Sequence, residues 1–170
     1  MYALILVYRA DVNLPDAQGL TALYHATVGG HVDIVSILLN HGAKVAQEDH
    51  EGPTPLRLAL DGGYIEIVEL LLSRGSKPTE PDTEGNTLLH VAARNNWVGV
   101  VRLLLARDKD APPYSRAPRQ CDARNTDGDT PLHLAVEASA PEVVRLLVGA
   151  GADPWAVNGA GEKPIMLRSE

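Results

Sequence analysis

Six histidines and one cysteine are the side chains of this 170-residue chain best suited to bind a metal ion or attack a substrate. Cys121 has no second cysteine with which to form a zinc ribbon or a redox pair, and the sequence implies no base to activate its thiol. His31 and His41 lie at opposite ends of one predicted helix, about 15 Å apart at the α-helical rise, so they cannot share an ion on that helix. The sequence therefore predicts neither a metal site nor a cysteine nucleophile.

The glycine-rich C-terminal segment is the place where a phosphate-binding loop would be expected, and it does not match one. Residues 149–163 lack the Gly-Lys-Ser/Thr ending of such a loop, and no Gly-x-Ser-x-Gly motif occurs in the chain. Paired carboxylates fall on predicted turns that are open to water, where nothing would keep one of them protonated. We therefore expect no catalysis and no cofactor.

Composition and charge limit the class of protein further. With 170 residues, of which 45% are hydrophobic, the chain is suited to one domain with a sizeable core. A net charge of −7 disfavours binding to nucleic acid or to an anionic membrane. The longest apolar run, residues 2–8, is too short to span a bilayer. A single cysteine fits a reducing compartment, so we expect a cytoplasmic or nuclear protein.

The elements that carry these residues follow a 33-residue period. Gly19, Gly52 and Gly85 are 33 residues apart, and the threonine, leucine and alanine that follow each of them keep the same spacing. The next match, Gly128, comes 43 residues after Gly85, and Gly161 resumes the period. Four units are therefore present, with about ten extra residues between the third and the fourth.

Each unit predicts two short helices. The first begins where a threonine can cap it and a proline can occupy its first turn, as at Thr54 and Pro55. It ends near a residue that can adopt the left-handed conformation, such as Gly63. Asn96 and Ser139 stand at this position in later units, and asparagine tolerates the conformation better than serine. The second helix shows apolar residues at helical spacing, and neither helix can bury its apolar face unless the units stack.

The first helix of each unit resembles the ankyrin repeat. Residues 130–135, Thr-Pro-Leu-His-Leu-Ala, reproduce the ankyrin signature Thr-Pro-Leu-His-x-Ala, and residues 54–59 and 87–92 are near matches. The resemblance covers almost the whole chain. It implies an all-α solenoid of helix-turn-helix units with projecting hairpin loops.

The signature position also gives an interpretation of three histidines. The resemblance implies that His90 and His133, which occupy it, form hydrogen bonds to the backbone. His25 instead falls one position later, where another unit has Leu134, so we expect it to replace a core aliphatic residue. All three are interpreted as structural residues.

We predict one ankyrin-repeat domain over residues 1–170. Its parts are a half repeat (1–15), repeat 1 (16–48), repeat 2 (49–81), repeat 3 (82–124, with the insertion near 109–121), repeat 4 (125–157) and a partial repeat 5 (158–170). Terminal repeats normally need a polar outer face, whereas the first half repeat is almost wholly apolar. We therefore expect the chain to be part of a longer array. The alternative is a chain that self-associates through its apolar N-terminal half repeat.

The resemblance implies non-catalytic protein binding through the hairpin tips and the ends of the first helices. Carried onto this sequence, the positions include His50, Glu51, Asp61, Thr83, Glu84, Asn86, Arg94, Asn95, Asp127, Asp129 and Glu137. Acidic side chains in this set outnumber Arg94 by six to one, which places a net −5 of the total −7 on one surface. We expect a partner with a Lys/Arg-rich peptide or helix. The alternative is that solvated turns are simply rich in Asp and Glu.

Two further features are candidates for partner contact. The insertion is net positive and contains three prolines that forbid a helix. It is either a tolerated surface loop or a second contact arm carrying Tyr114 and Arg116. Trp155, at a hairpin, is either an exposed interface anchor or a residue that packs against a further unit.

Three functions remain open from the sequence. The apolar ends favour one region of a larger scaffold or regulatory protein. The alternatives are a stand-alone inhibitor that occludes an enzyme or transcription factor, and the regulatory array of an enzyme whose catalytic domain is absent from this chain.

Overall fold

The computed structural model describes residues 11–45, 54–78, 81–109 and 120–164. Every regular element within these ranges is a helix. The chain forms two compact units, Met1–Lys77 and Pro78–Glu170, which divide close to the predicted end of repeat 2. The fold class expected from the sequence, an all-α solenoid of helix pairs, is confirmed.

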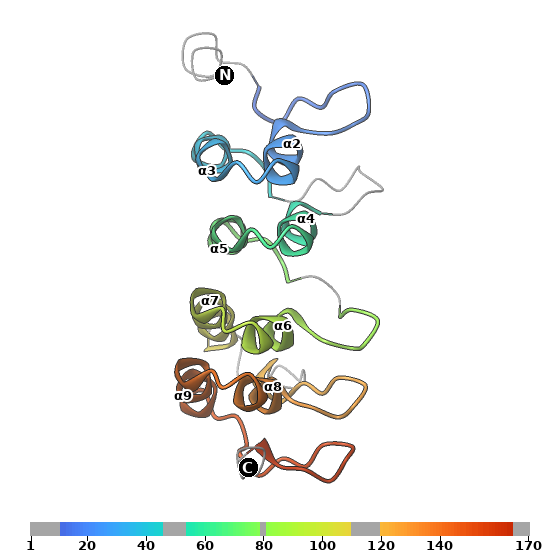
Figure 1. The fold of residues 1–170 in the computed structure, drawn as a ribbon. Coiled ribbons are helices and arrows are strands. Elements are labelled where there is room, and N and C mark those ends of the chain that lie inside the picture. Colours follow the sequence, from blue (N-terminus) through green and yellow to red (C-terminus); the bar gives the residue numbers. More distant parts are fainter. Residues whose placement is uncertain (1–10, 46–53, 79–80, 110–119, 165–170) are drawn as a thin grey trace. The chain divides into compact units, whose positions relative to one another are not determined.

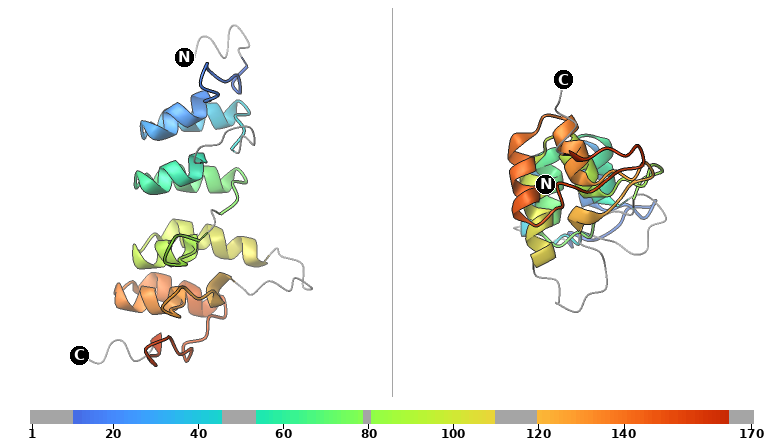
Figure 2. Two further views of the ribbon diagram at one scale, coloured as in Figure 1. Left: turned by 90° about the vertical axis from the view of Figure 1, so that its right-hand side faces the viewer. Right: turned by 90° about the horizontal axis from the view of Figure 1, so that it is seen from below.

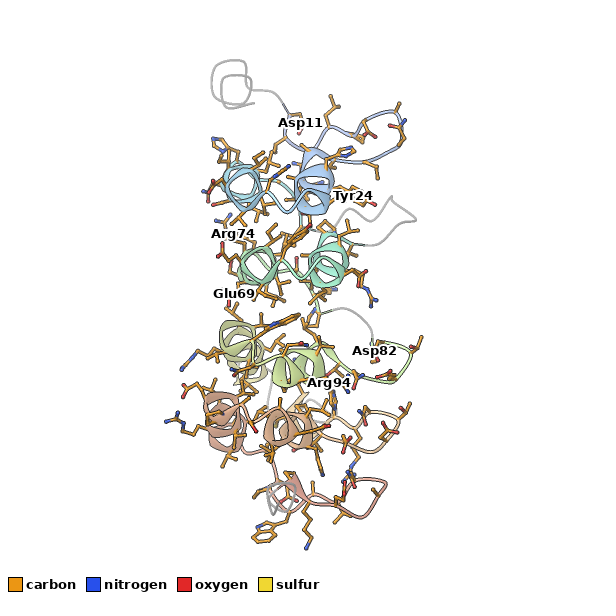
Figure 3. All side chains as sticks on the ribbon, viewed as in Figure 1. Asp11, Tyr24, Glu69, Arg74, Asp82 and Arg94 are labelled. Atoms are coloured by element: carbon orange, nitrogen blue, oxygen red, sulfur yellow. The ribbon has the colours of Figure 1, made fainter. Side chains whose placement is uncertain are left out.

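The first unit contains two helix pairs. Helices α2 (Ala22–Val28) and α3 (Val32–Asn40) form one pair, and α4 (Pro55–Asp61) and α5 (Ile65–Ser73) form the next. The first helices α2 and α4 pack on each other, as do the second helices α3 and α5 (Figure 1). Arg74, after α5, donates a hydrogen bond of 2.6 Å to the side-chain oxygen of Asn40 at the end of α3 (Figure 3). Corresponding helices of neighbouring repeats are therefore in register.

The second unit repeats this arrangement. Helices α6 (Leu88–Arg94) and α7 (Val98–Lys109) form one pair, and α8 (Pro131–Glu137) and α9 (Pro141–Gly149) form the other. Helix α6 packs on α8 and α7 on α9, and Figure 2 shows these helices from the side. A short 3₁₀ turn, η1 (Gln120–Asp122), contacts α7 and α8. The loops that precede α6 and α8 project on the same side of the unit (Figure 1).

The helices start and stop where the sequence predicts. The hydroxyl oxygens of Thr21 and Thr54 accept hydrogen bonds from backbone N–H groups at the starts of α2 and α4. In the first unit the left-handed residues that follow the first helices are glycines, Gly30 with φ +66° and Gly63 with φ +68°. Asn96 and Ser139 adopt the same conformation, with φ of 55° and 53°. Serine therefore takes, at a cost, a backbone geometry that suits glycine.

Aliphatic side chains at the repeat period make up the core. Leu23, Leu56, Leu89 and Leu132 occupy equivalent positions in the four first helices, and each is at most 1% exposed. Burying a leucine side chain contributes about 2 kcal/mol. Because each first helix has only seven residues, this burial between repeats is what makes the helices stable.

The prediction for His25 is wrong. Its side chain is 57% exposed, and its Nε2 lies 2.7 Å from Oδ2 of Asp16. At the equivalent positions Leu58 and Val91 are half-buried whereas Leu134 is 2% exposed, so the depth of this position differs between repeats. The hydrogen bond from His25, together with one from the Leu20 N–H, lowers the pKa of the Asp16 carboxyl.

Candidate partner-binding surface

The hairpin loop that begins at Asp82 is organised by that residue's own carboxylate. Its Oδ1 accepts hydrogen bonds from the backbone N–H groups of Glu84 and Asn86, at 3.0 and 2.8 Å. The Asp82 carbonyl oxygen accepts a third from Gly85, whose φ is +74°. Burial raises the pKa of the Asp82 carboxyl, but the hydrogen bonds from Asn86 and Glu84 together lower it below its usual value. Asp82 therefore stays ionised and holds the tip in one conformation.

The same design recurs three more times with aspartate or asparagine. The side-chain oxygen of Asp16, Asn125 or Asn158 accepts hydrogen bonds from backbone N–H groups two and four residues later. A left-handed glycine follows three residues after each of them. The hairpin shape is thus encoded within each loop and does not depend on a neighbour.

Backbone hydrogen bonds also stack the three hairpins of the second unit, residues 82–86, 125–129 and 158–162. The N–H and the hydroxyl of Thr126 both donate to the carbonyl oxygen of Glu84, at 2.9 and 2.8 Å. Gly159 N–H donates to the carbonyl oxygen of Asp127 at 2.8 Å. A Cβ atom on Gly128 would lie 2.8 Å from the Gly159 nitrogen, so this close approach also requires glycine. The tips therefore form a regular edge.

In the second unit, a buried histidine connects each first helix to the hairpin that follows. Nδ1 of His90 accepts a hydrogen bond from the Thr87 N–H, while its Nε2 lies 3.0 Å from the carbonyl oxygen of Asp129. His133 makes the equivalent contacts to Thr130 and to the Glu162 carbonyl oxygen. Since a backbone N–H can only donate, Nδ1 carries no proton in this arrangement and Nε2 does. Burial lowers the pKa of His90, which favours this neutral form.

The comparison with protein families agrees with this geometry. The family model described as ankyrin repeats (3 copies) matches residues 1–82 and again residues 74–158. The chain belongs to the ankyrin repeat family. No curated protein matches the sequence significantly. Ankyrin repeats are generally protein–protein interaction modules and are typically non-catalytic.

Several site residues predicted from the ankyrin resemblance lie together in the second unit. Thr83 and Glu84 on one hairpin tip and Asp127 on the next are exposed. Arg94, on α6, lies 3.8 Å from the Glu84 carboxylate, and Figure 3 shows it on the same side of the unit as Asp82. Glu137 is exposed at the end of α8.

Other predicted residues are engaged within the ankyrin scaffold. Asn86 is 3% exposed and accepts a hydrogen bond of 3.0 Å from the Asn125 side chain, so its side chain stabilises the hairpins. Asp129 is half-buried and accepts one of 2.8 Å from the Asn158 side chain. Asn95 donates to the Val91 carbonyl oxygen at the end of α6. We leave Asn86 out of the proposed contact surface.

Two further predicted residues make other contacts. Asp61, in the first unit, forms an ion pair of 2.9 Å with Arg57 one helical turn away. Trp155 is 57% exposed, and the Lys163 ammonium lies 5.6 Å from its ring centroid. The other four predicted residues, His50, Glu51, Tyr114 and Arg116, lie outside the described residues.

Sequence reasoning missed the residues that organise the surface. The Arg124 guanidinium donates to the carbonyl oxygens of Gly128 and Val157, at 3.1 and 2.6 Å, a role that its place in the sequence does not indicate. It thereby joins two hairpins. The organising role of Asp82 and its equivalents was also missed, although an Asp or Asn three residues before each periodic glycine is visible in the sequence.

Within the described residues, no helix is both long and apolar enough to cross a membrane. The same ranges contain no group of three His, Cys, Asp or Glu side chains placed to hold a metal ion.

Proposed function

We propose that this ankyrin chain is a non-catalytic protein-binding module of a larger scaffold or regulatory protein, and that the hairpin tips of its second unit bind a Lys/Arg-rich segment. The observation that carries the proposal is the stacking of the hairpins. The backbone hydrogen bonds from Thr126 and Gly159 hold Glu84 and Asp127 on neighbouring tips, with both side chains exposed.

The charges of this edge support a basic partner. The three stacked hairpins contain five acidic side chains and no basic one: Asp82, Glu84, Asp127, Asp129 and Glu162. Among the described residues, no hydrogen bond or ion pair engages the Asp127 carboxylate. The Arg94 guanidinium lies 3.8 Å from the Glu84 carboxylate, and the Arg94 side chain is 48% exposed. Water and a competing cation can therefore reach this ion pair.

The hairpin loops are also preorganised for binding, which supports the proposal further. A flexible acidic loop would lose conformational entropy when it bound a partner, whereas these loops are already fixed by their own hydrogen bonds. Several carboxylates of one sign at fixed positions also attract an oppositely charged segment over about one Debye length, some 8 Å at physiological salt. Association should therefore be fast and sensitive to salt.

A charge-reversal pull-down from cell lysate tests the proposal. The variant Glu84→Lys/Asp127→Lys is compared with the wild-type chain, and captured proteins are quantified at low and at raised salt. The matched control is Asp33→Lys/Glu66→Lys, which makes the same charge change at exposed first-turn positions of α3 and α5. Circular dichroism checks that both variants fold.

We expect the hairpin variant to lose partners that the control variant retains, and we expect those partners to be released by salt. Partners that bind the wild type, the hairpin variant and the control variant equally well would contradict the proposal. The acidic side chains would then serve only to solvate the loops. We also propose a cytoplasmic or nuclear location, because a chain with a single cysteine, Cys121, suits a reducing compartment.

A further inference from the structure

Side-chain amides join the three stacked hairpins of the second unit. Nδ2 of Asn125 donates to Oδ1 of Asn86, on the preceding hairpin, at 3.0 Å. Nδ2 of Asn158 donates to Oδ1 of Asp129 at 2.8 Å and links the hairpin 158–162 to its neighbour in the same way. Each link needs an amide as its donor, because an ionised carboxylate at either position would carry no proton to donate.

The side chain that begins each hairpin therefore has two separate tasks. Its Oδ1 accepts the backbone hydrogen bonds that shape the loop. Asp16 and Asp82 perform this first task with a carboxylate, and Asn125 and Asn158 perform it with an amide. The link to the preceding hairpin, in contrast, uses the amide NH₂ group. Converting Asn158 into aspartate would therefore keep the shape of its own hairpin and remove a link between two hairpins.

The residue after Asn158 makes this conversion chemically accessible. Asn158 is the one asparagine of the sequence that precedes a glycine, and asparagine is among the thermolabile residues. Gly159 has no Cβ to hinder its backbone nitrogen. When this nitrogen attacks Cγ of Asn158, the Cγ–Nδ2 bond breaks, and ammonia leaves with the proton of the Gly159 amide. Water then opens the resulting succinimide, at Cγ to give aspartate or at the main-chain carbonyl carbon to give isoaspartate.

The stacked hairpins restrain both reacting groups. The Gly159 N–H donates to the carbonyl oxygen of Asp127 at 2.8 Å, so its nitrogen is not free to attack. The amide group that would leave from Asn158 is held by Asp129, and the Oδ1 of the same amide accepts two backbone hydrogen bonds within its loop. Reaction therefore requires the hairpin to open first.

We propose that Asn158 is a deamidation site whose reaction rate is set by the opening of the hairpin 158–162, and that deamidation weakens the attachment of this hairpin to its neighbour. An aspartate carboxylate here would face Asp129, and it would also lie near Glu162, whose Oε2 is 3.4 Å from Nδ2 of Asn158. Like charges at such distances repel. Isoaspartate would instead lengthen the main chain by one carbon and displace the Gly159 N–H. The reaction needs water and no partner protein.

The rate of deamidation in the full chain tests the first part of the proposal. Peptide mapping by mass spectrometry follows conversion at Asn158 at mildly alkaline pH, in the folded chain and in urea. We expect the folded wild type to react at least about tenfold more slowly than the unfolded chain. Asp129→Leu removes the acceptor and should react several-fold faster than the wild type.

Asp129→Asn is the matched control for this variant. It removes the same charge but keeps an acceptor, because an amide oxygen already accepts the equivalent bond at Asn86. We expect it to deamidate at the wild-type rate. Circular dichroism checks that both variants fold.

Hydrogen exchange followed by NMR tests the consequence of the reaction. The Gly159 amide bonds across to the neighbouring hairpin, whereas the Glu162 amide bonds within its own loop. Asn158→Asp should lower the protection of the Gly159 amide about tenfold and that of the Glu162 amide by less. The double variant Asn158→Asp/Asp129→Asn exchanges donor and acceptor, so it should restore the protection of Gly159.

Four results would overturn the proposal. They are equal rates in the folded and the unfolded wild type, no conversion at Asn158 even in urea, and conversion in Asp129→Asn as fast as in Asp129→Leu. The fourth is unchanged protection of Gly159 in Asn158→Asp. The wild-type rates and the exchange of Asn158→Asp decide the matter even if Asp129→Leu does not fold.

Discussion

At the scale of single residues, a buried histidine holds two repeats together only while it is neutral. His90 is 0% exposed and links Thr87 at the start of α6 to the Asp129 carbonyl oxygen of the next hairpin. Removing its side chain leaves a buried N–H and a carbonyl group without partners as well as a cavity.

We predict that His90→Ala lowers the free energy of unfolding by about 3 kcal/mol, measured by urea denaturation. The control is His25→Ala, which removes an exposed histidine and its hydrogen bond to Asp16. That change should cost less than about 1 kcal/mol. Equal losses for the two variants would contradict the structural role assigned to His90.

The pH dependence of stability follows from the same residue. Burial lowers the pKa of His90 in the folded chain, so the unfolded chain takes up the proton first as pH falls. At pH values above about 6.5, the usual pKa of histidine in an unfolded chain, the protonation of His90 does not affect stability. As the pH falls further, the free energy of unfolding declines. The decline ends once the pH is below the lower pKa that His90 has in the folded chain.

The variant His90→Gln should therefore show a shallower loss of stability than the wild type as pH is lowered from about 7 toward 5. The comparison is made by urea denaturation at a series of pH values, and only the difference between the two proteins is assigned to His90. Parallel curves would show that His90 does not titrate differently in the folded chain.

At the scale of secondary-structure elements, the turn between α8 and α9 carries identifiable strain. Ser139 has φ 53° where the equivalent residues Gly30 and Gly63 have φ of 66° and 68°. We predict that Ser139→Gly raises the free energy of unfolding by about 1 kcal/mol, because a left-handed serine costs more than a left-handed glycine. Asn96→Gly, at the same position of repeat 3, should gain less.

Thermal and urea denaturation of the two variants provide the measurement. A loss of stability in Ser139→Gly would show that the serine side chain makes a contact that outweighs the backbone strain.

The elements were predictable from the sequence because each is encoded locally. The threonine cap, the first-turn proline and the periodic leucines such as Leu56 and Leu132 all specify the same helix starts and the same buried face. The hydrogen bonds from His90 and His133 to the backbone followed from the family resemblance. His25 was misjudged because a period gives the position of a residue but not how deeply that position is buried.

The candidate surface was only partly predictable. Glu84 and Asp127 follow from the positions of the hairpin tips, but the burial of Asn86 depends on Asn125, 39 residues away in the chain.

At the scale of the whole molecule, the two compact units should differ in their response to local damage. Within each unit the repeats pack on each other, so a cavity lowers stability most within the unit that contains it. Leu104 in α7 and Leu71 in α5 are both 0% exposed. Replacing either by alanine should cost about 3 kcal/mol.

Hydrogen exchange followed by mass spectrometry can locate this loss. Leu104→Ala should reduce protection mainly in α6–α9, and Leu71→Ala mainly in α2–α5. A uniform loss of protection along the chain in both variants would show that the molecule unfolds as one cooperative body.

We have proposed that the stacked acidic hairpins of the second unit bind basic segments. The most direct test is a ¹⁵N NMR titration of the full chain with a synthetic Lys/Arg-rich peptide. We predict that shift changes gather on the amides of residues 83–86 and 126–129, weaken with added salt and disappear in Glu84→Lys/Asp127→Lys. Shift changes confined to the outer faces of α7 and α9, or no saturable changes at all, would contradict the claim.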